Sequence, residues 1–129
     1  MDVPHDAILL RIFTSTSDRF GLHPLYHAIV LRAREMHLSG ATVFRSSLGF
    51  GQSSKLHHGQ VFQLSQDLPV VVEIVDSEEK ISAFLPVLDE MMESGLVTLE
   101  ATKVLQYNRQ RAGMRARIKE HFRRHLHVL

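Results

Sequence analysis

The chain has 129 residues, of which 44% are hydrophobic and 22% charged, a composition typical of one globular domain with its own core. It contains no cysteine, which excludes disulfides, zinc–thiolate sites and thiol catalysis. No apolar run approaches the length of a membrane span, and the opening MDVPHD lacks the basic start of a secretory signal, so we expect a cytoplasmic protein.

The formal net charge of +1 is unevenly distributed along the chain. Residues 107–129 hold seven lysines and arginines against Glu120 alone, whereas the rest of the chain holds eight basic and thirteen acidic residues. We therefore predict a mildly acidic domain over residues 1–107, followed by a basic C-terminal extension over residues 108–129.

The first elements are a strand and a helix. Residues 8–14 (ILLRIFT) are apolar and β-branched enough for a buried strand. Pro24 suits the first turn of a helix, and apolar residues then recur at helical spacing as far as Leu38. Gly40 lies where a C-terminal cap belongs.

The segment 40–54 (GATVFRSSLGFGQSS) is the most informative stretch for function. Its β-rich residues 41–45 lead into Gly49-Phe50-Gly51, and two glycines one residue apart let a backbone approach another group closely. Donors that suit an anion such as a phosphate surround them: Arg45, Ser53, Ser54 and Lys55. A plain tight turn at the end of a strand would give the same glycine pattern.

The second half of the domain repeats the pattern. Residues 60–64 could form a short arm of the loop, and residues 69–76 (PVVVEIVD) predict a strand in which Glu73 needs water, a subunit contact or a donor. Asp76-Ser77-Glu78-Glu79 predicts the start of a helix that ends at Gly95, with a kink or an interrupted first turn at Pro86. Residues 96–107 predict a last strand, with Val97, Leu99 and Ala101 on one alternation. The apolar face of the helix comprises Ile81, Phe84, Leu85, Leu88, Met91 and Met92.

The order strand, helix, strand, strand, helix, strand predicts an α+β, ferredoxin-like βαββαβ sandwich with a basic helical extension. Both helices would cover one face of an antiparallel sheet. Nothing in the sequence supplies a third layer for the other face, which favours oligomerisation through it.

Residues 8–107 resemble an uncharacterised PII-like family (domain of unknown function one-ninety), related to the PII nitrogen-regulatory signalling proteins. The resemblance implies a ferredoxin-like subunit, a homotrimer and adenine-nucleotide binding in the clefts between subunits. The matching stretches are Ser17-Asp18-Arg19, Pro24-Leu25-Tyr26, Gly40-Ala41-Thr42-Val43, Gly49-Phe50-Gly51 with Ser53-Ser54, and Asp67-Leu68-Pro69-Val70-Val71 with Glu73-Ile74-Val75-Asp76.

The same resemblance implies a mobile loop over residues 48–60 and a set of nucleotide-binding residues. The ligand would be AMP, ADP or ATP; the turn Glu93-Ser94-Gly95-Leu96 is too short for the second glycine-rich loop of PII proteins, so a mono- or diphosphate is as consistent as a triphosphate. Ser46 also replaces a glycine that is frequent in the family. The implied residues are Thr42, Arg45, Gly49, Phe50, Gly51, Gln52, Ser53 and Ser54, with Arg109 and Arg111 at PII-like spacing.

Other chemistry is less well supported. The serines at 46, 47, 53 and 54 lack a nucleophile elbow, so we expect no enzyme and no catalytic residue. His121 and His125 lie one helical turn apart, but no cysteine accompanies them, and we expect no metal site. A metal-tolerance protein that binds through His57 and His58 remains an alternative.

The basic extension places Met114, Ile118, Phe122 and Leu126 four residues apart, on one helix face surrounded by basic residues. This helix could pack on its own trimer. It could also bind an acidic partner protein or an anionic membrane, with nucleic acid the weakest option. Two functions follow as hypotheses. One is a nucleotide-responsive PII-like regulator whose target, by analogy, would be a membrane transporter or channel. The other is an interaction module that acts through the basic helix.

Overall fold

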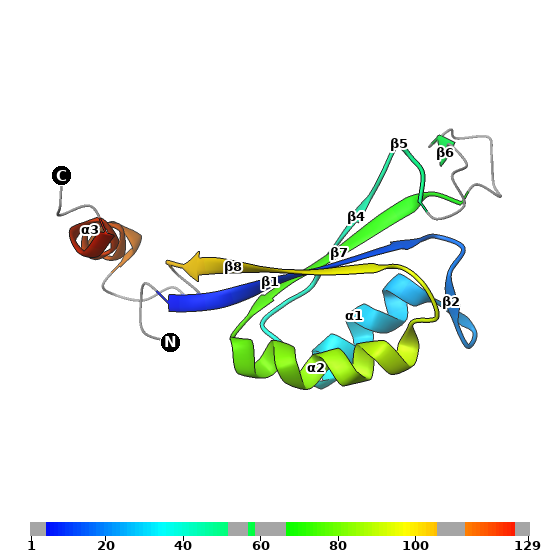
Figure 1. Ribbon diagram of the computed structural model, residues 1–129, viewed down its shortest axis with the longest axis horizontal. Helices are drawn as coiled ribbons and strands as arrows, with labels where there is room; N and C mark the ends of the chain where they lie inside the picture. Colours follow the sequence, from blue (N-terminus) through cyan, green and yellow to red (C-terminus); the bar gives the residue numbers. More distant parts are fainter. Residues whose placement is uncertain (1–4, 52–56, 59–66, 106–112, 126–129) are drawn as a thin grey trace.

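The computed structural model describes residues 5–51, 57–58, 67–105 and 113–125 (Figure 1). In chain order the elements are β1 (His5–Ser15), β2 (Arg19–Phe20), β3 (His23–Pro24), α1 (Leu25–Glu35), β4 (Thr42–Arg45), β5 (Leu48–Gly49), β6 (His57–His58), β7 (Pro69–Asp76), α2 (Glu78–Met91), β8 (Leu96–Val104) and α3 (Gly113–His125).

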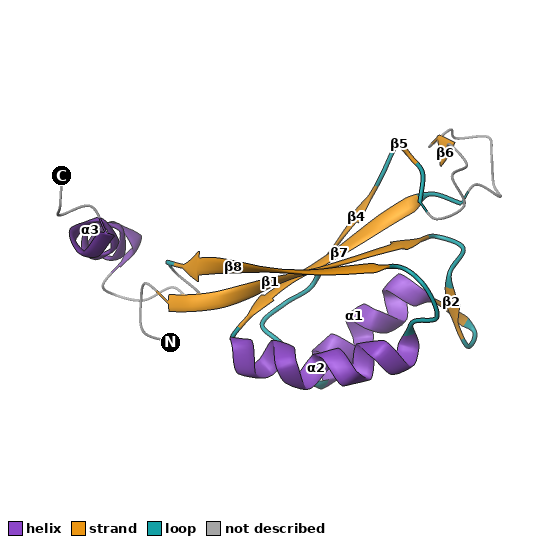
Figure 2. Cartoon of the chain, viewed as in Figure 1, coloured by secondary structure: helices purple, strands orange, loops and turns teal. Residues whose placement is uncertain are grey.

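Four strands form one sheet in the order β4-β7-β1-β8, and every neighbouring pair is antiparallel. Helices α1 and α2 lie together on one face of this sheet (Figure 2). This is the ferredoxin-like arrangement, so the predicted α+β fold is confirmed. Two short hairpins, β2–β3 and β5–β6, extend beyond the sheet. The second pairs Leu48 and Gly49 with His58 and His57, whereas the arm predicted at residues 60–64 lies outside the described residues.

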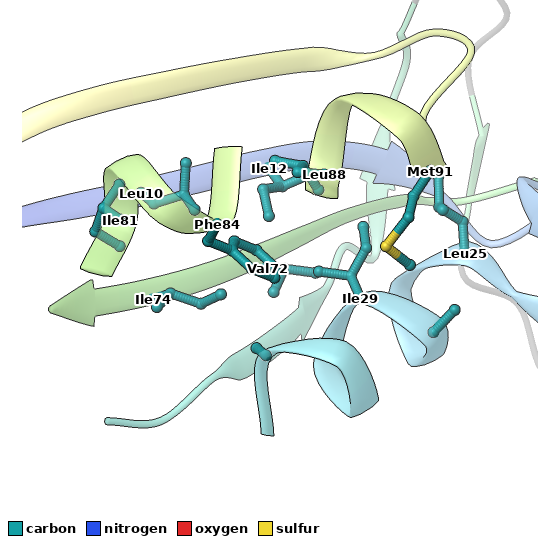
Figure 3. Packing of buried hydrophobic residues seen from close by; sticks show 12 residues of the cluster. Leu10, Ile12, Leu25, Ile29, Val72, Ile74, Ile81, Phe84, Leu88 and Met91 are labelled. Carbon is teal, nitrogen blue, oxygen red and sulfur yellow. The ribbon is translucent and has the colours of Figure 1, made fainter. Parts of the chain in front are cut away.

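The core lies between the sheet and the two helices (Figure 3). Strand alternation sends Leu10 and Ile12 of β1, and Val72 and Ile74 of β7, toward the helices, where all four are fully buried. Phe84 of α2 packs among them and is also fully buried. The apolar helix face predicted from the sequence therefore faces the core.

The end of α1 differs from the sequence-based expectation. The helix stops at Glu35, and the residue with positive φ is His37 (φ 60°), whereas Gly40 does not adopt that conformation. The Leu38 amide donates to the Ala33 carbonyl at 3.0 Å, which closes the helix in a Schellman motif. Leu38 then packs against the core, so the helix ends three residues before the position predicted from spacing.

Helix α2 begins as predicted. The Ser77 side chain accepts a hydrogen bond from the Lys80 amide at 3.2 Å. Buried Asp76 accepts from the amides of Ser77 and Ser39, both at 2.7 Å, and so joins the start of α2 to the loop before β4. The helix continues through Pro86 to Met91 without the interruption that was one predicted outcome, and the other, a kink at Pro86, stays a prediction. Strand β8 ends at Val104, and Tyr107 lies outside the described residues.

Helix α3 lies beyond the sheet, past the first residues of β1 and the last residues of β8 (Figure 1). The sequence predicted an apolar helix face surrounded by basic residues. Arg117 is instead buried, whereas Phe122, on the face predicted to be apolar, is 49% exposed. In the described part of the chain, no helix combines the length and the apolar character needed to cross a bilayer.

Candidate functional site

Several of the segments that carry the family resemblance meet at one end of the sheet, where β1 ends and β7 begins. The Thr16 amide donates to the Leu68 carbonyl at 2.9 Å, and the Leu68 amide donates to the Thr16 hydroxyl at 3.0 Å. The Ser17 amide donates to a carboxylate oxygen of Asp67 at 3.3 Å. Stretches that lie 50 residues apart in the sequence are therefore held side by side.

Asp18 fixes the turn that leaves β1. Its carboxylate accepts hydrogen bonds from the Thr14 hydroxyl and from the Ser15 amide, the latter at 3.0 Å. Its carbonyl accepts from the Leu25 amide at 2.7 Å, at the first residue of α1. One aspartate thus sets where the helix starts relative to the sheet end, which explains why a short polar turn can precede a helix without a serine or threonine cap.

Arg45 is the cation at this end of the sheet. It is the last residue of β4, and its guanidinium donates to the Tyr26 hydroxyl and lies 5.3 Å from the centre of the Tyr26 ring. Tyr26 comes from the first turn of α1. The tyrosine holds the guanidinium in place on the exposed surface and leaves further N–H donors of the arginine available for an anion. Tyr26 belongs to one of the stretches that carry the family resemblance, but nothing in the sequence indicated that it contacts Arg45.

The residues after β4 are anchored on Pro69. The Ser46 amide and hydroxyl both donate to the Pro69 carbonyl, at 3.0 and 2.9 Å. At Gly49 a Cβ atom would lie 3.1 Å from Pro69 Cγ, so the predicted close approach at this glycine is to the proline ring. A Cβ at Gly51 would meet nothing within 4 Å, and Phe50 between the glycines is 64% exposed.

The remaining predicted nucleotide-binding residues are not all at this end of the sheet. Thr42 starts β4 and pairs with Glu73, on the sheet face opposite to Arg45 and about 10 Å away along the strand. The structure therefore brings Arg45 and the Gly49–Gly51 segment close to Pro69 but separates Thr42 from them. Five predicted residues lie outside the described residues: Gln52, Ser53, Ser54, Arg109 and Arg111.

Arg45 is exposed on the surface of the described chain. Two cavities of the described chain, of about 360 and 420 Å³, lie elsewhere, beside the two ends of α2. A ligand at Arg45 would be only partly enclosed by one copy of the chain. A small anion held there would need either the following loop or a second copy to bury it.

The sheet face opposite to α1 and α2 carries an ionic network. Arg11 Nε lies 2.8 Å from Glu73 Oε2, and Arg11 Nη1 lies 2.9 Å from Glu100 Oε2. The hydrogen bond to Glu73 raises the pKa of Arg11. Glu73 therefore meets a donor, one of the alternatives left open by the sequence. None of the described helices covers this face, on which Phe44, Val75 and Leu96 are exposed.

Within the basic helix α3, two arginines form ion pairs with Glu120. Arg123 Nη2 lies 2.7 Å and Arg124 Nε lies 2.9 Å from Glu120 Oε1. These contacts, led by the hydrogen bond from Arg123, lower the pKa of Glu120 from 4.5 to about 2. The rings of His121 and His125, considered above as a metal pair, stack with their centroids 4.4 Å apart. Among the described residues, no group of three potential metal ligands gathers there or elsewhere.

The lowered pKa predicts how α3 responds to acid. Because the pKa of Glu120 is lower in the folded chain, its ion pairs stabilise α3 fully above pH 4.5, and this contribution is lost as the pH falls toward 2. We expect an NMR titration of the Glu120 side-chain carboxyl to give a midpoint near 2. A Glu120 midpoint at the ordinary value would contradict the ion-pair geometry.

Comparison with known proteins agrees with this fold. Residues 7–104 match the family model DUF190 (Uncharacterized ACR). A UPF0166 protein of Aquifex aeolicus (strain VF5) is 46% identical over 97 residues, which cover 75% of this chain and 91% of that protein. A UPF0166 protein of Methanocaldococcus jannaschii is 34% identical over 94 residues, covering 72% of this chain and 86% of that protein.

Two solved structures share the fold at low sequence identity. One is a protein of Thermus thermophilus described as a PII-like signalling protein, with a TM-score of 0.57, 18% identity, and coverage of 81% of this chain and 93% of that chain. The other is CPII, a nitrogen regulatory PII-like protein of Thiomonas intermedia K12, bound to ADP, AMP and bicarbonate, with a TM-score of 0.52, 15% identity, and coverage of 78% and 89%. With the matched residues spanning most of the ferredoxin-like sheet and both of its helices, the chain belongs to the DUF190 family and has a PII-like fold.

Proposed function

We propose that this protein is a PII-like regulator that binds an adenine nucleotide where copies of the chain meet. The observation that carries the proposal is the place of Arg45. It stands beside Tyr26 at the sheet end where the family-matching segments converge, and it is the last residue of the strand that leads into the glycine-containing loop. An oriented guanidinium with further N–H donors suits a phosphate. The fold is shared with CPII, which was solved with ADP, AMP and bicarbonate.

The open sheet face supports a homotrimer as the binding form. Phe44, Val75 and Leu96 are exposed on it around the Arg11–Glu73–Glu100 network. A sheet face with this much apolar surface is usually covered by another layer, and none of the described helices covers it. Arg45 projects from the other face of β4, but β4 is an edge strand of the sheet, so a copy associated through the open face could reach Arg45 by extending past that edge. A trimer in solution, measured by analytical ultracentrifugation, is the expected result, and a monomer would contradict the inter-subunit site.

The regulatory step would be a shift in the population of loop conformations and no covalent chemistry. The loop over residues 48–60 would have two conformations, and the nucleotide would contact it in only one of them. The nucleotide then favours that conformation by the difference in its affinity for the two. The loop would then present or withdraw a surface for a partner protein, one option being a membrane transporter or channel. Exposed Leu48 and Phe50 at the start of the loop are suited to such a contact.

Gly51→Asp tests the nucleotide site. A Cβ at Gly51 meets nothing within 4 Å and its backbone does not have positive φ, so the aspartate fits while placing a negative charge beside the proposed phosphate position. We expect isothermal titration calorimetry to detect binding of at least one of AMP, ADP and ATP to the unchanged chain. Like-charge repulsion should weaken that binding roughly tenfold or more in the variant.

Gly40→Asp is the matched control, because Gly40 has the same open surroundings before β4 starts, and nucleotide affinity should stay unchanged there. The proposal is overturned if none of the three nucleotides gives a binding heat, or if Gly51→Asp binds as tightly as the unchanged chain.

A further inference from the structure

A second feature of the molecule lies on the helix side of the sheet, along its edge strand β8. Val97 and Leu99 pair with Ile12 and Leu10 of β1 and share their face of the sheet. The two β1 residues are fully buried, whereas Val97 is 38% and Leu99 is 54% exposed. The difference arises because α2 packs over β1 and does not reach over β8. Apolar side chains on the inner face of β8 are therefore left accessible beside α2.

Two cavities of the described chain lie at the two ends of this strip. The one of about 420 Å³, at the C-terminal end of α2, is bounded by Leu85, Met92 and Val97 and by the carboxylates of Asp89 and Glu93. The other, of about 360 Å³, touches Glu78 at the N-terminal end of α2 and Ala101 of β8. Leu99 lies between them along β8. We give the name α2–β8 groove to the cavity bounded by Leu85, Asp89, Met92 and Val97, together with the exposed side chain of Leu99 that follows Val97 on the same face of β8.

The rim of the α2–β8 groove is acidic. Helix α2 and the turn that follows carry five carboxylates against one lysine, and that lysine, Lys80, donates its ammonium to the His37 carbonyl at 2.8 Å. In the described part of the chain none of the five makes an ion pair, so the described residues do not neutralise their charge. The five are Glu78, Glu79, Asp89, Glu90 and Glu93.

Helix α3 has the complementary properties. It carries five basic residues against Glu120, and neither Arg115 nor Lys119 makes an ion pair among the described residues. Arg115, Lys119 and Phe122 are exposed at positions i, i+4 and i+7, so they share one helix face. Its 13 residues match the 14 residues of α2, which corresponds to about 20 Å for each at 1.5 Å per residue.

We propose that α3 of one copy lies in the α2–β8 groove of a second copy. Phe122 would enter the apolar strip beside Leu99, and the basic residues of α3 would face the carboxylates of α2. The α3 of the same copy lies past the other end of β8 (Figure 1), where the pKa of Asp6 is lowered mainly by Lys103 and also by the charge of His125. It is therefore about 25 Å along β8 from Val97. This assigns the groove to another copy of the chain.

The absence of cysteine allows a direct test by cross-linking. A chain with Leu99→Cys is mixed with a chain carrying Phe122→Cys, and the disulfide between copies is followed on a non-reducing gel. Leu22→Cys, at a position 91% exposed on the β2–β3 turn, replaces Leu99→Cys in the control. We expect a cross-link for the Leu99 and Phe122 pair and its loss for the control pair.

Charge reversal makes the test specific. Asp89→Lys with Glu93→Lys in the Leu99→Cys chain should abolish the cross-link, and Arg115→Glu with Lys119→Glu in the Phe122→Cys chain should restore it. An equal yield from the Leu22→Cys control overturns the groove assignment. So does a disulfide that closes within one copy at high dilution in a chain carrying both cysteines, because the chain's own α3 would then fill the groove.

The outcome does not depend on nucleotide binding, since the cross-link is formed without any nucleotide. Calorimetry could detect no nucleotide binding while the cross-link still forms, and nucleotide binding could be detected while no cross-link forms. If vesicles that contain phosphatidylserine bind the unchanged chain and no cross-link forms, α3 is a membrane-binding helix and the proposal is wrong.

Discussion

Phe84→Ala is expected to lower the free energy of unfolding by about 3–5 kcal/mol, as replacements of buried aromatic residues by alanine usually do. Phe84 is fully buried between the sheet and α1, and it contacts the core formed by both central strands. Removing the ring leaves a cavity that the rigid sheet cannot close. Urea unfolding followed by circular dichroism measures the loss.

The control for Phe84 is Leu22→Ala. Leu22 is also a large apolar residue, but it is almost wholly exposed at the β2–β3 turn, so its replacement should change the unfolding free energy by about 0.5 kcal/mol at most. Similar losses for the two variants would show that the core is not where the structure places it.

Gly95→Ala is expected to cost about 2–4 kcal/mol of unfolding free energy, since it combines a strained backbone with a steric clash. Gly95 has φ +127°, a conformation that residues with side chains rarely adopt. A Cβ there would lie 2.8 Å from the carbonyl oxygen of Phe13 and 2.7 Å from Met92 Cε. Phe13 pairs with Leu96, so relief of the clash would displace the start of β8.

Gly40→Ala separates this steric effect from the general effect of replacing glycine. Gly40 has an ordinary φ, and a Cβ added there would meet nothing within 4 Å. Alanine at this position should therefore leave the free energy of unfolding unchanged or raise it by up to about 1 kcal/mol, because alanine reduces the conformational freedom of the unfolded chain. Thermal unfolding of both variants gives the comparison. A Gly95→Ala variant as stable as Gly40→Ala would exclude the close approach to β1.

Part of the candidate site could be predicted from local sequence. The β-rich run before Gly49-Phe50-Gly51 located both Arg45 and the following loop, because strand propensity and glycine act over a few residues. Tyr26 and Pro69 could not be given roles in the same way. Their contacts to Arg45 and Gly49 exist only once α1 and β7 pack beside β4, and no spacing in the chain encodes that.

The sequence by itself determined the order of the main strands and helices, the apolar face of α2, and the basic character of the last 23 residues. These follow from periodicity and composition, which are properties of neighbouring residues. Only the tertiary structure decided that Glu73 pairs with Arg11, that His37 closes α1, and that Arg117 is buried while Phe122 is exposed. Each of these depends on which distant segment lies alongside, and that is settled by packing and not by local preference.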